Sequence, residues 1–347
     1  MLFVAVMAAG VWGLGVAFGA PQRARWILIA AFLVAVIAVH LVLPIAHPLR
    51  LGLGETAAPW LFILGIAGLV WGYRWVLHRL RTQALVKEET VALDAPIFSE
   101  TELNRYARHI VMREMGGAGQ KALKQAKILV VGAGGLGSPV LQYLAAAGVG
   151  TIGVIDDDEV DNANLQRQVI HRDDNIAMAK VFSAQAAMIA QNPFVDVRPY
   201  QRRLTDDIAV ELVAEYDLVL DGCDNFETRY LVNKACVETR APLISGALTQ
   251  WEGQLSVFDP AKGAPCYQCI FPQAPAPELA PSCSEAGVIG PLPGVVGSMM
   301  AIEAIKVITG AGVPLRGEMV IYDGLYGESR KITLEPRANC PICSKTE

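Results

Sequence analysis

A glycine-rich turn within the stretch 127–139, KILVVGAGGLGSP, is the first place where residue types and spacing point to chemistry. Gly132, Gly134 and Gly137, with Gly135 among them, satisfy a GxGxxG pattern between an apolar strand and a helix. The first glycine permits a tight turn, the second lets phosphate approach the backbone, and the third lets helix and strand pack. The start of the helix supplies N–H donors for phosphate. The pattern therefore predicts a nucleotide site.

A carboxylate follows at the distance expected for ribose binding. Asp156 lies 24 residues after Gly132, at the end of the next predicted strand. A carboxylate placed there can hold ribose hydroxyls. These features alone fit a nicotinamide-dependent oxidoreductase, which stays open as an alternative function of a different class.

Further polar residues favour a triphosphate. Asn164 and Arg167 lie in the stretch NLQRQ, and Lys180 opens the next predicted helix. Two cations beside a phosphate site would neutralise charge that develops on a triphosphate during displacement, whereas they do not assist hydride transfer. The alternative is that both cations belong to a solvated basic face.

A second acidic turn follows a short predicted strand. Asp224 and Asn225 come directly after Leu218–Asp221, so they are expected at the carboxyl edge of the sheet, where ligands bind. Asp224 could hold Mg²⁺ there. The alternative is that Asp224 is only the N-cap of the next helix.

Two CxxC pairs predict a metal site. The two pairs are separated by 71 residues, counted from Cys269 to Cys340. Four thiolates form a closed tetrahedral zinc site that has no open position for a substrate. We therefore expect a structural Zn²⁺ rather than a redox pair, held by Cys266, Cys269, Cys340 and Cys343.

The other three cysteines stand apart from these pairs. Cys283 lies in a proline-rich stretch that we expect to be a long loop, from which a thiol could reach an activated acyl group at a later step. The alternative is a small loop residue without a role. Cys223 and Cys236 are interpreted as small buried residues.

The elements around these motifs alternate between strand and helix from residue 127 onward. This alternation predicts an α/β fold with a mostly parallel, Rossmann-like sheet, helices on both faces and an antiparallel extension. A capping box of Ser99 and Glu102 is expected to begin the domain. We divide the chain into a membrane segment (1–82), a linker (83–98) and an α/β domain with the zinc site (99–347).

Three uncharged runs precede this domain, at 1–20, 26–46 and 56–73. Each approaches the length of about 20 residues that a transmembrane helix needs. A signal peptide is disfavoured because residues 2–10 contain no Lys or Arg, and a buried helical hairpin is the remaining alternative. Arginines after the first and third runs place the domain at the cytoplasmic side of a cell inner membrane, which a multi-pass segment would cross.

The ordered series of motifs between about 100 and 345 resembles the MoeB/ThiF/HesA family, bacterial relatives of ubiquitin-activating enzymes. The matching motifs run from Arg105-Tyr-Ala-Arg108-His through GAGGLG, IDDDEV, NLQRQ, DGCDN and both CxxC pairs to CSEAGV. The resemblance implies ATP-dependent adenylation of the C-terminal glycine of a ubiquitin-like sulfur carrier. A MoaD-like carrier for molybdopterin biosynthesis is favoured, with a ThiS-like carrier of thiamine biosynthesis as the alternative.

The resemblance also implies roles and partners. Gly134 and its neighbours would approach the phosphates, Arg167 and Lys180 would contact the triphosphate, and Asp224 would hold Mg²⁺. Arg108 matches an arginine that family dimers lend to the partner subunit, which implies a homodimer. Cys283 matches a loop cysteine that some relatives use covalently. A sulfur-donor protein is a further partner that the family allows.

Two features depart from the family, and one function class is disfavoured. Ala177 and Ala179 stand where the family often has glycine and proline, and its soluble members lack the N-terminal runs. The net charge of −5 gives no reason to propose nucleic-acid binding. A membrane-tethered scaffold without activity is a third alternative. It is disfavoured because the polar residues that the family uses are all present: Arg108, Arg167, Lys180 and Asp224.

Overall fold

The computed structural model describes residues 2–19, 21–44, 47–53, short stretches between 58 and 79, 97–275 and 286–344. The chain divides into two compact units, Met1–Pro96 and Ile97–Glu347. The predicted linker (83–98) lies almost entirely outside the described residues, as does Cys283.

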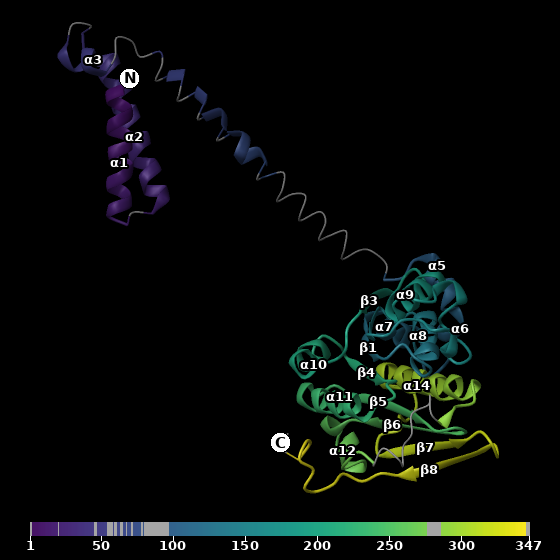
Figure 1. The fold of residues 1–347 in the computed structure, drawn as a ribbon. Helices are drawn as coiled ribbons and strands as arrows, with labels where there is room; N and C mark the ends of the chain where they lie inside the picture. Colours follow the sequence, from purple (N-terminus) through teal and green to yellow (C-terminus); the bar gives the residue numbers. More distant parts are fainter. Residues whose placement is uncertain are drawn as a thin grey trace. The chain divides into compact units, whose positions relative to one another are not determined.

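The N-terminal unit contains helices α1 (Leu2–Ala17), α2 (Gln22–Val42) and α3 (Pro48–Leu53) (Figure 1). Trp12 of α1 meets Trp26 of α2 edge to face, with 5.0 Å between ring centroids. Among the described residues of this unit, the apolar side chains that are buried are Val36 and Ile37. The described residues of this unit therefore leave most of their apolar surface uncovered.

The expectation of three transmembrane helices is not supported. Among the described residues, two helical stretches are long and apolar enough to span a membrane, Ala24–Val42 and Pro291–Thr309. The second belongs to the C-terminal unit and packs inside it. Helix α1 has only 16 residues, which is short of the required length. The predicted run 56–73 is described only in short stretches.

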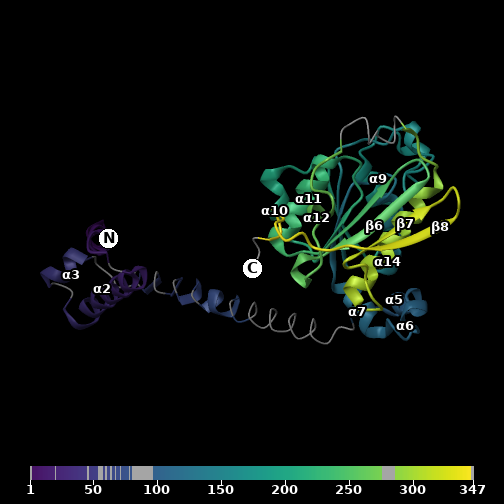
Figure 2. The same ribbon diagram turned by 90° about the horizontal axis from the view of Figure 1, so that it is seen from below.

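The C-terminal unit is built on an eight-stranded sheet in the order β3-β2-β1-β4-β5-β6-β7-β8. The first five strands in this order pair in parallel, and β6, β7 and β8 extend the sheet by antiparallel pairing. Figure 1 and Figure 2 show the hairpin of β7 and β8, in yellow, at one edge. The strands are β1 (Lys127–Val131), β2 (Thr151–Ile155), β3 (Asp196–Tyr200), β4 (Leu218–Asp221), β5 (Leu243–Leu248), β6 (Glu252–Phe258), β7 (Glu318–Asp323) and β8 (Glu328–Thr333).

Helices cover both faces of this sheet because alternate strand residues point to opposite sides. Ile128 and Val130 of β1 join a core with α8, α9 and α14, whereas Leu129 and Val131 join a second core with α10, α11 and α12. The predicted α/β fold with an antiparallel extension is confirmed. The helices are α5 (Glu100–Arg105), α6 (Ala107–Ile110), α7 (Gly116–Gln125), α8 (Gly137–Ala147), α9 (Lys180–Gln191), α10 (Asp206–Val213), α11 (Phe226–Thr239), α12 (Tyr267–Ile270) and α14 (Pro291–Thr309).

The start of this unit is fixed as the sequence predicts. The Ser99 hydroxyl accepts a hydrogen bond from the backbone N–H of Glu102, and the Glu102 carboxylate accepts from the backbone N–H of Ser99. Lys124 pairs with Glu102 and lies over the ring of Phe98. The capping box therefore ties the first helix of the unit to α7.

Candidate adenylation site

A cavity of about 1380 Å³ opens at the carboxyl ends of the parallel strands. Strand β1 pairs with both β2 and β4. Strands β2 and β3 extend the sheet on one side of β1, and β4 and β5 extend it on the other side. Ligands bind at such a switch point in open α/β sheets. Eight of the predicted site residues line the cavity: Gly132, Gly134, Gly135, Asp156, Arg167, Lys180, Asp224 and Asn225.

Each glycine after β1 is required for a different structural reason. Gly132 has a φ of +96°, and a Cβ there would lie 3.2 Å from the carbonyl oxygen of Gly222. A Cβ on Gly137 would overlap the carbonyl oxygen of Gly132, so Gly137 serves helix packing and does not line the cavity. A Cβ on Gly134 would meet only Gln168, at 3.7 Å. Gly134 therefore leaves room for a ligand.

Asp156 holds the glycine turn as well as facing the cavity. Its Oδ2 accepts a hydrogen bond from Ala133 N (2.8 Å), and its Oδ1 accepts from Asp158 N (2.8 Å). Burial raises the pKa of Asp156, against the lowering effect of the nearby Lys180 charge. The carboxylate is thus fixed in direction, with lone pairs left for ribose hydroxyls.

The two predicted cations differ in their surroundings. Lys180 is only 4% exposed, and its Nζ lies 2.7 Å from Asp158 Oδ2, so it does not belong to a solvated basic face. Arg167 donates to Asn164 Oδ1 at 2.8 Å. Asn164 itself does not line the cavity, and in this structure it orients Arg167.

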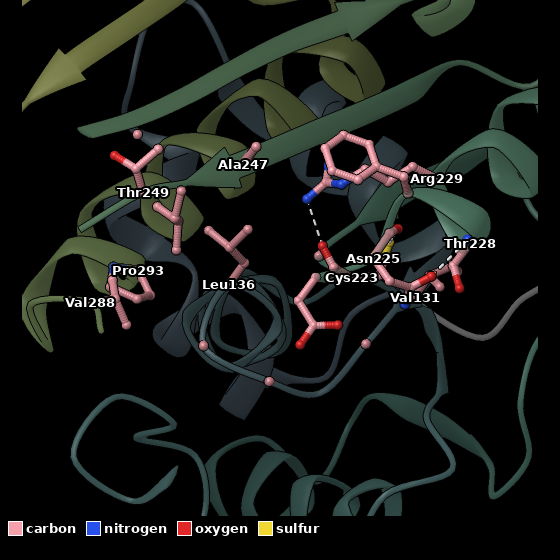
Figure 3. A pocket seen from close by; sticks show the side chains of 18 of the residues that line it. Val131, Leu136, Cys223, Asn225, Thr228, Arg229, Ala247, Thr249, Val288 and Pro293 are labelled. Carbon is pink, nitrogen blue, oxygen red and sulfur yellow. Dashed lines mark hydrogen bonds between the residues drawn. The ribbon is translucent and has the colours of Figure 1, made fainter. Parts of the chain in front are cut away.

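The turn after β4 corrects one alternative from the sequence. The N-cap of α11 is Asn225, whose Oδ1 accepts a hydrogen bond from Thr228 N at 2.9 Å (Figure 3). Asp224 is therefore not the helix cap. Its carboxylate lines the cavity without a hydrogen bond to the described residues. Such a carboxylate fits the oxygen ligands that Mg²⁺ prefers.

A buried network behind Asp224 was not predicted from the sequence. Arg229 Nη2 donates to the carbonyl oxygen of Cys223 (2.6 Å), as Figure 3 shows, and Nη1 contacts Asp221 Oδ2 (3.1 Å). Asp221 also accepts hydrogen bonds from Cys223 N and Ser245 Oγ. Both backbone polar atoms of Cys223 are therefore held, which fixes the residue before Asp224.

The thiol of Cys223 belongs to the same network. Burial raises the pKa of Cys223 well above its usual value, so the protonated thiol donates to Asp221 Oδ1 at 2.7 Å. Cys236 is buried as predicted, at 3% exposure. Neither thiol is placed as a nucleophile by this geometry.

Gln168 is a further cavity residue that the sequence did not single out as a site residue. Its side chain is 5% exposed, and its Oε1 has no hydrogen-bond partner among the described residues. A buried polar atom without a partner is costly unless a ligand or water satisfies it. Its position directly after Arg167 is the one sequence signal that could have pointed to it.

Arg108 lies apart from this cavity. It belongs to the short helix α6 (Ala107–Ile110) and does not line the cavity of its own chain. A single chain therefore does not bring Arg108 together with Lys180 and Asp224.

The four predicted metal ligands do come together. The Sγ–Sγ distances are 3.8 Å for Cys266–Cys269, 3.6 Å for Cys266–Cys340 and 3.4 Å for Cys269–Cys343. Tetrahedral zinc with Zn–S bonds of about 2.3 Å requires sulfur separations of roughly 3.8 Å. Burial raises the pKa of Cys266 and that of Cys343, whereas backbone hydrogen bonds from Cys343 and Ile342 outweigh burial at Cys340 and lower its pKa to about 7. The cluster fits Zn²⁺.

This cluster also supports one wall of the cavity. Helix α12 (Tyr267–Ile270) carries Cys269, and Tyr267 and Ile270 line the cavity. Tyr267 packs edge to face against Tyr230 of α11, with ring centroids 5.6 Å apart. Loss of a metal ion from this cluster would therefore disturb the wall of the cavity that α12 forms.

Comparisons with known proteins identify the family. The ThiF family model matches residues 106–342. The sulfur carrier protein adenylyltransferase of Thermus thermophilus is 48% identical over 250 residues, which cover 71% of this chain and 92% of that protein. The SAMP-activating enzyme E1 of Haloferax volcanii is 44% identical over 256 residues, covering 74% of this chain and 92% of that protein.

A solved structure shares the fold. E. coli MccB with ATP has a TM-score of 0.61 and 25% sequence identity, and the match covers 69% of this chain and 74% of that chain. The similarities favour adenylation over the nicotinamide-dependent oxidoreductase that the glycine pattern alone allowed. The chain belongs to the ThiF family of adenylyltransferases.

Proposed function

We propose that this enzyme uses ATP to adenylate the C-terminal glycine of a ubiquitin-like sulfur-carrier protein. The observation that supports this most is that Gly134, Lys180, Arg167 and Asp224 all line one cavity at the switch point of the sheet. The relatives named as sulfur carrier protein adenylyltransferase and SAMP-activating enzyme E1 support the same chemistry.

The reaction joins the carrier carboxylate to AMP. A carboxylate oxygen attacks the α-phosphorus, the bond from this phosphorus to the bridging oxygen breaks, and pyrophosphate leaves. No general base is required because the nucleophile is already an anion. Catalysis is mostly positioning and charge neutralisation, supplied by the Gly134 backbone, Arg167 and Lys180. Asp224 would hold Mg²⁺, which neutralises phosphate charge when it is bound.

The cavity is larger than a nucleotide alone requires. Ligand sites for small molecules commonly measure about 300–1000 Å³, whereas this cavity measures about 1380 Å³. Residues 249–254 of the β5–β6 hairpin line the cavity too. We propose that this part takes the carrier's C-terminal tail, with a MoaD-like carrier favoured over a ThiS-like one. The acyl adenylate would then await sulfur from a donor protein, and Cys283 would act only at that later step.

Carrier-dependent ATP–pyrophosphate exchange tests the function. The purified enzyme should exchange labelled pyrophosphate into ATP with a MoaD-like carrier, and a carrier that lacks its last glycine should give none. Trapping of the acyl adenylate with a panel of carriers would identify the substrate. Absence of exchange with every carrier would refute the proposal.

We also propose a homodimer in which Arg108 completes the site of the partner subunit. Arg108 does not line the cavity of its own chain, which supports a role in trans. Mixing Arg108→Ala chains with Lys180→Ala chains should recover part of the lost activity, since one site of each mixed dimer contains both intact residues. No recovery after proven subunit exchange would count against the shared site.

We further propose that the N-terminal unit tethers the enzyme to a cell inner membrane, with the catalytic unit on the cytoplasmic side. The exposed apolar side chains of α1 and α2 favour lipid, and Arg23 and Arg25 lie in the first turn of α2. The full chain should resist carbonate extraction from membranes, whereas a chain that begins at Ser99 should be recovered without them. Release of the full chain by carbonate would contradict the tether.

A further inference from the structure

His171 is a buried titratable side chain that the proposed adenylation does not use. It is 6% exposed and does not line the cavity. Its Nε2 lies 2.9 Å from the carbonyl oxygen of Ala133, and its Nδ1 lies 2.9 Å from Ser183 Oγ. Because a carbonyl oxygen only accepts, Nε2 carries the ring proton. Burial lowers the pKa of His171, which favours a neutral ring, and the Ser183 hydroxyl has both Nδ1 of this ring and Asn175 Oδ1 (3.3 Å) as acceptors.

The contact with Ala133 sets the direction of a neighbouring N–H group. Ala133 is fully buried between Gly132 and Gly134, and its own N–H is held by Asp156. A trans peptide group is planar, so the Ala133 carbonyl and the Gly134 N–H point in opposite directions. The Gly134 N–H therefore points away from His171, and Gly134 lines the cavity whereas His171 does not.

The same side chain ties the glycine turn to the helix that carries Lys180. Ser183 lies on α9 one turn after Lys180 and is 1% exposed. Lys180 contacts Asp158 through both Nζ and its backbone N–H. Asp158 in turn donates its backbone N–H to Asp156. These contacts close a ring that passes through Ala133, Asp156, Asp158, Lys180, Ser183 and His171.

We propose that His171 is a positioning residue that fixes the Gly134 N–H relative to the Lys180 ammonium and so orients the triphosphate. The identity of this ligand rests on the proposed function. Both groups are donors to phosphate, and only their relative placement allows them to act on one triphosphate together. A misplacement of about 1 Å in such a site can cost about 100-fold in rate.

Two substitutions at this position separate the hydrogen bond from packing. His171→Phe keeps a ring and removes both hydrogen bonds, whereas His171→Gln keeps an N–H donor that can reach Ala133. We expect His171→Phe to lower the kcat of ATP–pyrophosphate exchange about 10- to 100-fold, and His171→Gln to recover most of it. Lys180→Ala should cost much less in the His171→Phe background than alone, because both changes break one shared arrangement.

Binding of a non-hydrolysable ATP analogue, measured by calorimetry, separates this inference from the proposed function. The Kd should rise about 3- to 10-fold for His171→Phe and stay near that of the parent for His171→Gln. This result would support the inference even if no carrier gave exchange. Parent-like binding and kcat for a folded His171→Phe would overturn it, as would equal losses for both variants with additive effects at Lys180. If His171→Phe does not fold, Ser183→Ala should lower kcat severalfold, and an unchanged kcat would refute the inference.

Discussion

The turns after β1 and β4 meet in the same cavity, but different kinds of residue shape them. A Cβ on Gly132 would lie 3.2 Å from the carbonyl oxygen of Gly222, so the two turns pack directly against each other. The conformation of the first turn depends on glycines, which allow a positive φ and leave space because they have no side chain. The second turn follows from the ion pair of Asp221 and Arg229, whose side chains are 1% and 7% exposed.

The difference predicts where substitutions act. In the first turn the backbone itself is the proposed ligand-binding group, so we expect single added methyl groups to change binding or packing directly. In the second turn the backbone is held by charges that lie behind the cavity, so their removal destabilises the domain. Asp224, which lines the cavity, is expected to contribute to function without holding the fold.

The largest effect is expected from loss of Zn²⁺ at the four-cysteine cluster. Helix α12 carries Cys269 and packs against α11, the helix that follows the β4 turn. Cys340→Ser should lose zinc, since binding free energies at structural zinc sites are on the order of 10 kcal/mol. Hydrogen exchange should become faster in α11 and α12, while amides of the β1 turn keep their protection. Elemental analysis should find one zinc per chain in the parent and in a Cys236→Ala control. A Cys340→Ser chain with full zinc content and parent melting would contradict the site.

Removal of the buried cation should come next. Arg229→Met leaves Asp221 buried without its partner, which typically costs about 3–5 kcal/mol. Urea unfolding would measure this loss, and adding Asp221→Asn to the same chain should recover part of it. Arg203→Met is the matched control, because Arg203 pairs with Glu227 at the surface and should change stability by about 1 kcal/mol or less. Equal losses for both arginines would remove the distinction between the two turns.

Substitution of the ligand-facing carboxylate should affect rate and not stability. Asp224→Asn removes an anionic charge, while the helix keeps its cap at Asn225. We expect ATP–pyrophosphate exchange to fall about 100- to 1000-fold, as for other lost electrostatic contacts, with unchanged melting. Cys283→Ala should leave exchange nearly normal, because Cys283 is proposed to act later. Near-normal exchange by Asp224→Asn would end its assignment as the Mg²⁺ ligand.

The contrast between the turns also explains what could be predicted from the sequence. The β1 turn is a local property, so GxGxxG and the carboxylate of Asp156 indicated it directly. Arg229 looks like an ordinary helix residue in NFETRY, and nothing nearby in the sequence shows that it is buried against Ser245 from another strand. Long-range packing of this kind has no local pattern.

The same reasoning applies to the elements. The strands predicted before the glycine turn, before Asp156 and over Leu218–Asp221 match β1, β2 and β4, because these three strands are apolar and buried. Strand β8 was not predicted, since ESRKIT is exposed at all six positions and has no apolar face. Helix α7 was missed because its sequence contains three glycines. The strands could therefore be predicted where the sequence has runs of apolar residues that become buried, and not at the exposed edge of the sheet.

Two glycines of the β1 turn offer a direct test of their separate roles. Gly137→Ala would force a Cβ into the carbonyl group of Gly132, and we expect a loss of about 1–3 kcal/mol in unfolding free energy. Gly134→Ala meets only the flexible Gln168 side chain, so stability should change by about 0.5 kcal/mol or less. Calorimetry should instead show weaker binding of an ATP analogue to Gly134→Ala. Loss of stability at Gly134 with parent-like binding would reverse these assignments.

Ala177 is a residue with a side chain in a backbone conformation that favours glycine. Its φ of +70° lies in the left-handed region, which costs a residue with a Cβ about 1–2 kcal/mol. Its N–H donates to the carbonyl oxygen of Val160 at 2.9 Å, so the turn is held in place despite this cost. Ala177→Gly relieves the strain but loses about 0.5–1 kcal/mol to the greater freedom of the unfolded chain. We therefore expect a net gain of about 0.5–1 kcal/mol in urea unfolding. Ala186→Gly is the control, because Ala186 is an exposed residue inside α9, where glycine costs about 0.5–1 kcal/mol. A loss at both positions would mean that the Ala177 turn carries no strain that glycine relieves.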